Sequence, residues 1–319
     1  MGLAPVVDDL FLLEAHQIAL LPDRAPQREL AAVLHVHPNL QRFFVVRHPP
    51  IGGFLNRVLS EYGPVADGDL PAVRDTLLWE IADWIVYQRE PETYDDAALV
   101  SWDLDGVAQK VALDGKVVID AGAGTGRVAL AVAPLARHVF AVEPVAALRK
   151  FVREKAMSLR IGNLFVLDGQ LSAIPLPTRT ADVLLTCQAI GWDLAPELAE
   201  VERVVREGGT AMHMFGGPGV TQSDNPLHGP LLAHGYRSDI FEKGDVRMIR
   251  YWKQIGTSTE GPLHNATERP TAPGTEWRPG ARVTTKERLD EGSDRLCQQD
   301  RENQSGGRGD GRSRSGGGA

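Results

Sequence analysis

The residues best placed to do chemistry lie in one glycine-rich stretch, residues 116–127, which reads KVVIDAGAGTGR. An apolar run ends at Asp120, and glycines follow at every second position, at Gly122, Gly124 and Gly126. Glycine permits positive φ and, because it has no Cβ, lets a ligand lie directly on the backbone. The residues that follow favour a helix, whose first N–H groups would face that ligand. The pattern therefore predicts a nucleotide-type site at a strand–turn–helix junction.

The spacing of these glycines distinguishes two kinds of ligand. In the dinucleotide fingerprint G-x-G-x-x-G, counted from Gly122, the third glycine falls at Arg127. A carboxylate at Asp120 would repel a pyrophosphate, and it suits a ligand with a cationic amino group and no phosphate, such as S-adenosylmethionine. At this point the sequence resembles motif I of the class I S-adenosylmethionine-dependent methyltransferases. The resemblance implies that the turn binds this cofactor through Asp120, Gly122, Ala123, Gly124 and Gly126.

Three later strand ends continue the pattern. Glu143 ends a second predicted strand, residues 137–143, and lies 21 positions after Gly122. Doubly wound folds place the carboxylate that binds ribose hydroxyls at an offset of about 20. The family resemblance implies that Asp168 and Gly169, after a third strand over 163–167, meet the adenine. Cys187 ends a fourth predicted strand, residues 181–187, beside the expected position of the methyl group.

The acceptor side is less defined. The motif [DNS]-P-P-[YFW], typical of enzymes that methylate nucleobase amines, does not follow the fourth strand. Thr186 and Gln188 flank Cys187 where a cytosine-methylating enzyme has a proline, so a buried structural cysteine is favoured over a nucleophile. His213 and His228 are the weak candidates for a general base, and the catalytic residue stays open. By resemblance only, the candidate substrate wall consists of Tyr94, Trp102, Asp103, Gln188 and Trp192.

The elements that must position these residues alternate regularly. After the fourth strand we predict a helix over 195–207 that ends at Gly208 and Gly209, a fifth strand over 210–215, a helix over 225–233, and strands over 236–241 and 246–252. This order predicts an α/β fold, a Rossmann-like doubly wound seven-stranded sheet with a C-terminal antiparallel hairpin. The family resemblance covers about residues 75–255.

The N-terminal region is expected to be helical. Residues 8–21 are compatible with one helix, prolines divide residues 22–50 into short pieces, and an amphipathic helix over 75–88 stops before Pro91. The resemblance implies that such helices form a cap near the cofactor cleft. No carboxylate joins His35, His37 and His48 at a spacing typical of metal ligands, so no metal is predicted.

Composition limits the function further. The 319 residues are 43% hydrophobic and carry a formal net charge of −8, which argues against a broad nucleic-acid surface. Two distant cysteines, Cys187 and Cys297, do not suggest a disulfide framework. We find neither a leader pattern nor an apolar run of the ~20 residues that span a bilayer, so a cytoplasmic protein without membrane partners is the expectation.

The last part of the chain differs from the rest. Residues 257–319 contain one aromatic residue, Trp277, and no Ile or Phe, which is typical of a disordered low-complexity tail. An out-of-frame translation is a second interpretation. We therefore expect a helical N-terminal or cap region over 1–110, a cofactor-binding methyltransferase domain over 111–256 and the tail over 257–319.

Together these observations predict transfer of a methyl group from S-adenosylmethionine to a small-molecule acceptor by in-line displacement. The atom methylated and the oligomeric state stay open. A non-catalytic cofactor-binding protein of the same fold is one alternative. Another is a different nucleotide-binding α/β enzyme, such as an NAD(P)-dependent oxidoreductase, against which Arg127 and the C-terminal hairpin count.

Overall fold

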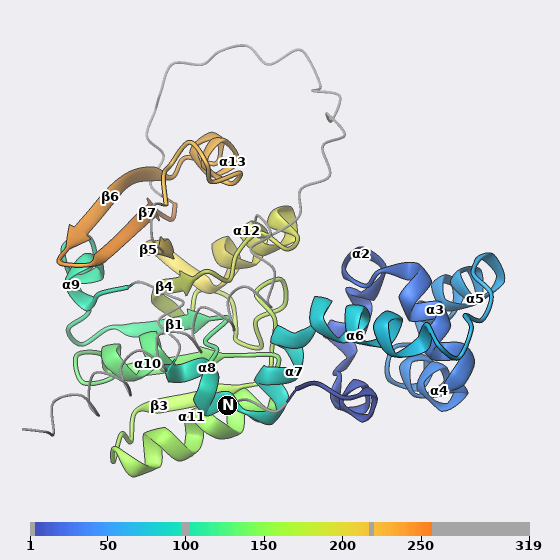
Figure 1. The fold of residues 1–319 in the computed structure, drawn as a ribbon. Coiled ribbons are helices and arrows are strands. Elements are labelled where there is room, and N and C mark those ends of the chain that lie inside the picture. The colour runs from blue at the N-terminus through green and yellow to red at the C-terminus, as the bar shows by residue number, and fades with distance from the viewer. Residues whose placement is uncertain (1–3, 97–101, 217–219, 257–319) are drawn as a thin grey trace, which may run out of the picture. The chain divides into compact units, whose positions relative to one another are not determined.

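A computed structural model describes residues 4–96, 102–216 and 220–256, and excludes the side chains of Tyr94 and Asp96. Its seven strands form one sheet in the order β3-β2-β1-β4-β5-β7-β6 (Figure 1). The first five strands run parallel, and β7 pairs antiparallel with both β5 and β6. The predicted doubly wound sheet with its antiparallel C-terminal hairpin is confirmed. The strands are β1 (Val117–Ala121), β2 (His138–Val142), β3 (Leu164–Leu167), β4 (Ala181–Cys187), β5 (Val205–Gly216), β6 (Arg237–Lys243) and β7 (Val246–Gln254).

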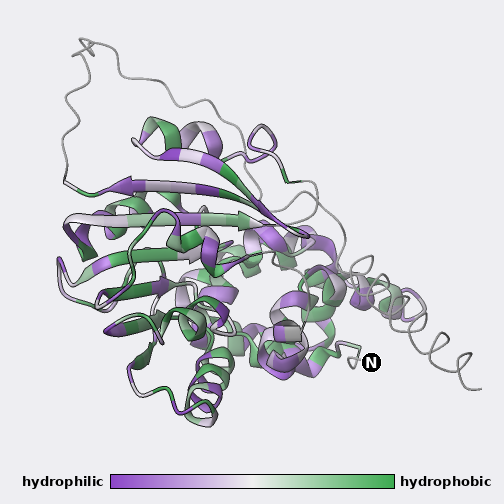
Figure 2. Cartoon of the chain, turned by 90° about the vertical axis from the view of Figure 1, so that its left-hand side faces the viewer, coloured by the Kyte–Doolittle hydropathy of each residue, from purple (hydrophilic) through white to green (hydrophobic). Residues whose placement is uncertain are grey.

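Helices cover both faces of this sheet. Ile119 and Leu184 face a core that includes α12 (Leu194–Val204) and α13 (His228–Ala233). The alternate residues Val118 and Leu185 face a second core with α9 (Leu104–Ala108) and α10 (Arg127–Val132). Green and purple mix along the helices beside the sheet, as expected for elements with one buried face (Figure 2). The central strands are apolar on both faces because helices bury both.

The parallel strands end at one edge, and this edge collects the predicted cofactor residues. The glycine turn follows β1, and Glu143 follows β2 directly. Asp168 follows β3, while Cys187 is the last residue of β4. Because β1 lies between β2 and β4, the chain changes direction along the sheet at this point. Open α/β sheets bind their ligands at such a switch point.

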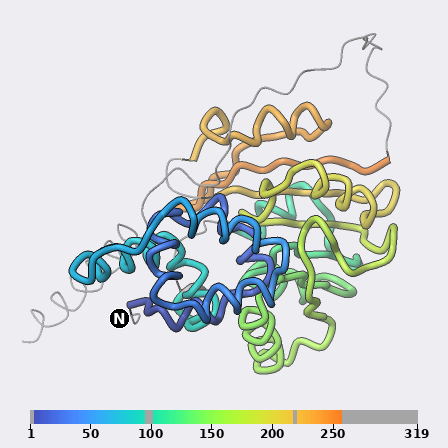
Figure 3. Tube along the Cα trace, turned by 90° about the vertical axis from the view of Figure 1, so that its right-hand side faces the viewer, coloured from blue at the N-terminus to red at the C-terminus, as the bar shows by residue number. Residues whose placement is uncertain are grey.

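The described residues divide into two compact units. One, residues 4–10 and 20–83, is a bundle of short helices, seen in blue in Figure 3. Its buried core includes Leu30, Leu34, Leu40, Phe44 and Leu55. Pro38 and Pro49 each begin a helix, where a missing N–H costs least, so the expected division into short pieces is confirmed. Its helices include α2 (Leu21–Arg24), α3 (Gln27–Val36), α4 (Pro38–Arg47), η2 (Pro49–Ile51), α5 (Gly52–Glu61) and α6 (Leu70–Glu80).

The second unit holds the sheet together with residues 11–19 and the chain from Trp84 onward. The boundary between the units therefore lies after Asp83, upstream of the expected boundary at 110. The reason is that residues before β1 already pack on the sheet: Val107 and Val111 belong to its core. This unit also contains α1 (Ala15–Ala19), α8 (Pro91–Asp96) and α11 (Ala146–Ser158), and α7 (Ala82–Arg89) crosses the boundary.

Four predicted helices have different bounds. The helix predicted over 225–233 is α13, which begins only at His228. Residues 8–21 form η1 (Val7–Leu12) and α1 rather than one helix. The predicted helix over 75–88 is two helices, α6 and α7, because Ile81 leaves the helical conformation at φ −120° and ψ 16°. The helix predicted over 195–207 ends at Val204, since Val205 is already extended and pairs with Ala181. Gly208 and Gly209 thus belong to β5 and not to a helix C-cap.

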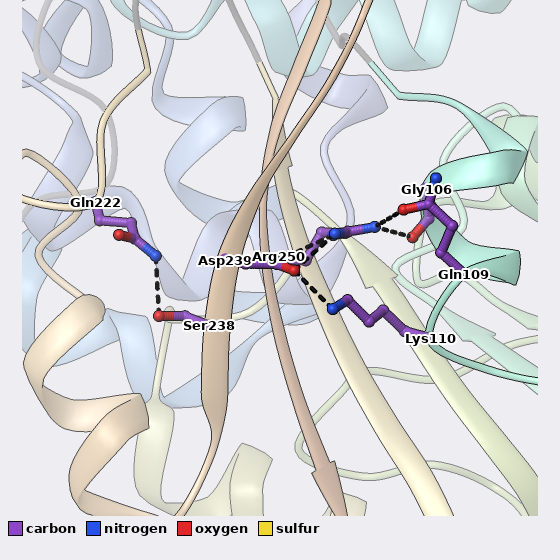
Figure 4. A network of polar contacts seen from close by, with 7 residues as sticks. All are labelled: Gly106, Gln109, Lys110, Gln222, Ser238, Asp239 and Arg250. Carbon is purple, nitrogen blue, oxygen red and sulfur yellow. Dashed lines mark hydrogen bonds and ion pairs between the residues drawn. The ribbon is translucent and has the colours of Figure 1, made fainter.

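One polar network ties the chain before β1 to the C-terminal hairpin (Figure 4). Arg250 of β7 is buried, and it donates two hydrogen bonds of 2.7 Å to the Asp239 carboxylate of β6. The same guanidinium donates to the Gly106 carbonyl at 2.7 Å and to Gln109 at 3.1 Å, while Lys110 pairs with Asp239 at 2.7 Å. These contacts fix α9 against β6 and β7.

Among the described residues, every helix is too short or too polar to cross a bilayer.

Candidate functional site

The glycine turn after β1 has the conformation that its sequence predicts. Gly122, Gly124 and Gly126 all have positive φ, of 73°, 55° and 79°. The N–H of Gly122 donates to the Val142 carbonyl at 2.8 Å, which ties the turn to the end of β2. A Cβ on Gly122 would lie 2.3 Å from the Cβ of Ala189. Glycine is required here both by the backbone and by the approach of the segment after β4.

Asp120 lies beneath this turn. Its side chain is buried, and one carboxylate oxygen accepts the Ala129 N–H of α10 at 2.9 Å. Burial raises the pKa of Asp120 to about 7, and the nearby Glu143 charge adds to the increase. Asp120 is thus a buried acid that a cationic ligand group would favour in its ionised form.

Glu143 joins the end of β2 to the glycine turn. One oxygen accepts the Gly124 N–H at 2.8 Å, and the other accepts the Val145 N–H at 2.9 Å. Only 5% of the residue is exposed, and burial raises its pKa to about 7. A carboxylate has about four acceptor positions, so two N–H bonds leave capacity for further donors.

A cavity of about 50 Å³ lies against the turn. It brings together residues from β1, the turn, α10, the end of β4 and the segment before α9, namely Trp102, Asp120, Gly122, Ala123, Gly124, Thr125, Arg127, Val128 and Cys187. A larger cavity of about 320 Å³ lies in the helical unit, and His37 and Arg74 are among the residues that line it. The chemistry of the smaller cavity, rather than its size, makes it the candidate site, because it contains the buried acid and the exposed backbone of the turn.

The residues at the end of β4 form another part of the site. Burial raises the pKa of the Cys187 thiol to about 12, so it stays protonated at neutral pH. Gln188 has a positive φ of 59°, and its side-chain amide donates to the Gly216 carbonyl of β5. Trp192 is 49% exposed. Positive φ in a non-glycine residue is uncommon and marks a constrained turn at this edge.

Asp168 and Gly169 lie after β3. The exposed Asp168 carboxylate forms an ion pair of 3.0 Å with Arg149 of α11. Arg149 also donates to the Glu143 and Pro144 carbonyls, at 2.9 and 2.7 Å. A Cβ on Gly169 would lie 2.6 Å from the Cδ of Pro175, so a larger residue would not fit. The sequence alone does not assign Arg149 to the site, because there it is one of several basic residues on a helix.

Other predicted residues lie apart from the cavity. His213 is fully buried, with its ring nitrogens at 2.9 Å from Thr186 Oγ1 and 3.0 Å from Tyr236 Oη, and burial lowers its pKa to about 3. Both ring nitrogens of His213 therefore have hydrogen-bond partners inside the core. His228 lies 3.0 Å from the Tyr251 hydroxyl, a residue of the sheet core. Neither histidine lines the cavity.

Asp103 has a local role, because its carboxylate caps α9 by accepting the Asp105 N–H at 2.8 Å, and it pairs with Lys243. Trp102, beside it, does line the cavity. The Tyr94 side chain lies outside the described part of the chain. Within that part, no three His, Cys, Asp or Glu side chains are grouped so that they could hold a metal ion.

Comparison with known proteins places the match on this same region. Residues 118–209 match the family described as a methyltransferase domain. The matched range runs from β1 into β5, so it contains the glycine turn, Glu143, Asp168 and Cys187.

Two curated relatives align with this chain, over 127 and 124 residues. The malonyl-[acyl-carrier protein] O-methyltransferase of Yersinia pestis is 30% identical over 127 residues, which are 39% of this chain and 46% of the relative. An uncharacterised methyltransferase of Mycobacterium tuberculosis is 31% identical over 124 residues, again 39% and 46% of the two chains. The chain thus spans less than half the length of these relatives. A crystal structure of a SAM-dependent methyltransferase from Aquifex aeolicus matches at 20% identity and a TM-score of 0.44, over 52% of this chain and 97% of the other.

Proposed function

We propose that this chain is a class I S-adenosylmethionine-dependent methyltransferase that transfers the methyl group of its cofactor to a small-molecule acceptor. The match of residues 118–209 to a methyltransferase domain supports this proposal. One observation carries the proposal. The buried Glu143 carboxylate contacts the glycine turn at the switch point of the sheet, where it accepts the Gly124 N–H at 2.8 Å. A buried acid in this position suits a ligand that presents paired hydroxyl donors, such as a ribose.

The residues at this edge of the sheet, some in the cavity and others beside it, suit the parts of this cofactor. Glu143 keeps unused acceptor capacity for the 2′- and 3′-hydroxyls of the ribose. Asp168, exposed after β3, would accept from the adenine amine, and Arg149 holds it in place. The methionyl end would lie on the turn over Asp120, whose ionised form a cationic amino group stabilises. The thiol of Cys187 would contact the cofactor as an uncharged group.

The protein's own contribution would be positioning. When bound, the cofactor supplies an activated methyl group on a sulfonium, so alignment of an acceptor can remove several kcal/mol of barrier without a dedicated catalytic side chain. Trp102 and the residues after β4, Gln188 and Trp192, would form the wall that orients the acceptor. The structure accords with such a mechanism, because Cys187 is protonated and His213 is engaged within the core.

A calorimetric titration of the whole chain with S-adenosylmethionine, S-adenosylhomocysteine and NAD⁺ tests the proposal. We expect binding of the first two with dissociation constants in the micromolar range, about −8 kcal/mol, and no binding of NAD⁺. A folded sample that binds only NAD⁺, or none of the three, would overturn the proposal. Cofactor binding without methyl transfer across a broad panel of acceptors would favour the non-catalytic alternative.

A further inference from the structure

A short segment near the N-terminus belongs to the unit that holds the sheet, although it precedes β1 by about a hundred positions. Residues 11–19 pack with the sheet unit, while the chain on either side of them belongs to the helical unit. The segment contains α1, in which Gln17 and Ile18 are buried. The family match begins only at residue 118, so it assigns nothing to this segment.

Glu14 attaches the segment to the edge of the candidate site. Its Oε1 accepts the Ala146 N–H, the first residue of α11, at 2.6 Å. The preceding amide, that of Val145, donates to Glu143 at 2.9 Å. Two carboxylates thus share consecutive N–H groups at the start of a 13-residue helix, where unpaired donors and the helix dipole both favour acceptors. Glu14 therefore lies immediately beside the acid assigned to the ribose.

Gln17 carries an unpaired donor next to this contact. Its Oε1 accepts the Glu14 N–H at 2.9 Å and the Gln88 side-chain amide at 3.1 Å, and the same Gln88 amide reaches Glu14 at 3.3 Å. Gln17 is 2% exposed, and within the described residues its Nε2 has no hydrogen-bond partner. Buried donors in folded proteins are nearly always paired, so this donor is available to an acceptor that binds from outside the chain.

His16 extends the segment toward the adenine end of the site. Burial lowers its pKa, and the charges that also act on it are those of Glu14, Asp168 and Arg149. Arg149 is the residue that binds both Asp168 and the Glu143 carbonyl. His16 is therefore within electrostatic range of Asp168 and Arg149, the pair assigned to the adenine.

We propose that residues 14–17 form the outer wall of the adenosine half of the cleft, and that the Gln17 carboxamide donates its free hydrogen bond to the bound adenosine. This inference rests on the proposed function, since it names the residues that complete the same site. Gln17 is then a binding residue, and Glu14 is a positioning residue that holds the segment on α11.

The substitution Gln17→Met removes the Nε2 donor and also the Oε1 that accepts from Glu14 and Gln88, and it keeps the length of the side chain. Calorimetry would measure S-adenosylhomocysteine and 5′-methylthioadenosine, which shares the adenosine but lacks the amino-acid end. We expect both ligands to bind roughly 3- to 10-fold more weakly, the effect of one lost hydrogen bond. The control Gln41→Met, a half-buried residue of the helical unit that donates to Asn56 at 3.0 Å, should leave both affinities unchanged. Unchanged affinities in Gln17→Met, in a sample that melts like the wild type, would overturn the inference.

Hydrogen exchange of the unaltered protein provides a second measurement, which does not depend on how the variant folds. The amides of residues 14–18 should exchange several-fold more slowly when S-adenosylhomocysteine is added. Exchange that does not respond, while the amides of the glycine turn become protected, would overturn this inference and leave the proposed function intact. A wild-type chain that binds neither ligand would overturn both.

Discussion

Glu143 shows how a single side chain can join separate parts of a site. Its two oxygens accept N–H groups from the glycine turn and from the start of α11, and it lies in a position that solvent barely reaches. The same carboxylate is within the electrostatic influence of Glu14. A residue with these contacts determines both the shape of the turn and the polarity of the cleft.

The substitution Glu143→Ala tests this role. It removes the acceptor for the Gly124 N–H and, under the proposed function, the acceptor for the ribose hydroxyls, so S-adenosylhomocysteine should bind about 1–3 kcal/mol more weakly. Calorimetry measures the difference, with Glu154→Ala on the exposed side of α11 as the matched control. Equal affinity in the Glu143 variant and the control would remove Glu143 from the site.

The raised pKa of Asp120 predicts how the folding stability depends on pH. Its pKa in the folded chain is raised to about 7, above the value of an exposed aspartate, so the folded state keeps a proton that the unfolded state releases. This contribution to stability is complete below about pH 4 and is lost as the pH rises toward 7. Glu143 acts in the same direction, since burial raises its pKa to about 7 as well.

The substitution Asp120→Asn should therefore reduce the loss of folding stability that the wild type shows as the pH rises. An asparagine oxygen can still accept the Ala129 N–H, but the side chain no longer ionises. Urea unfolding at pH 5 and pH 8 should show the variant gaining stability relative to the wild type as the pH rises, by up to about 1.4 kcal/mol for each unit of pKa shift that it removes. Parallel curves for the two proteins would contradict the assignment of this buried acid.

At the scale of elements, the glycine turn is both a loop and a packing surface. Gly126 is the N-cap of α10 at φ 79°, and a Cβ there would lie 2.9 Å from Cγ1 of Val152 in α11. Gly115, just before β1, has a similar φ of 66° with open space around the missing Cβ. A Cβ at Gly115 would cost only backbone strain, whereas a Cβ at Gly126 would cost backbone strain and crowding against Val152.

Alanine at each position tests this separation. Gly115→Ala should lower the free energy of unfolding by about 1–2 kcal/mol, the cost of left-handed backbone in an L-residue. Gly126→Ala carries that cost and, in addition, about 1–3 kcal/mol for overpacking against α11. Urea unfolding measures both values, and equal losses would show that Val152 moves aside freely.

At the scale of the whole molecule, the sheet is complete within the described residues. All seven strands lie between residues 117 and 254, and β7 is enclosed by β5 and β6. The Arg250 network joins the segment before β1 to the hairpin at the end of this unit (Figure 4). The sheet unit therefore carries its own core and the candidate site.

A chain shortened to residues 1–256 should keep this unit intact. We propose that residues 257–319 form a low-complexity tail, so their removal should change S-adenosylhomocysteine affinity by less than about twofold, or ~0.4 kcal/mol. Thermal unfolding would report stability, and calorimetry would report binding. A large loss in either measurement would assign the tail a structural or binding role.

The geometry of the glycine turn and of the strand ends in the candidate site could be predicted from sequence because its signals are local. The D-x-G-x-G-x-G turn requires glycine conformations within a few residues, and the acids follow apolar strands directly in the chain. Once the strands are parallel, their carboxyl ends must meet at one edge. Because the apolar runs are also local signals, the bounds of β2, β3 and β4 are predicted to within about one residue.

The tertiary structure decided the features that depend on distant partners. Glu14 meets the start of α11 only because residues 11–19 pack with the sheet unit, and Arg149 becomes relevant only when Asp168 lies opposite it. The end of α12 depends on the pairing of Val205 with Ala181 in β4. Periodicity and spacing describe neighbours along the chain, whereas these contacts arise from neighbours in space, and the free energy of packing and pairing outweighs local preference there.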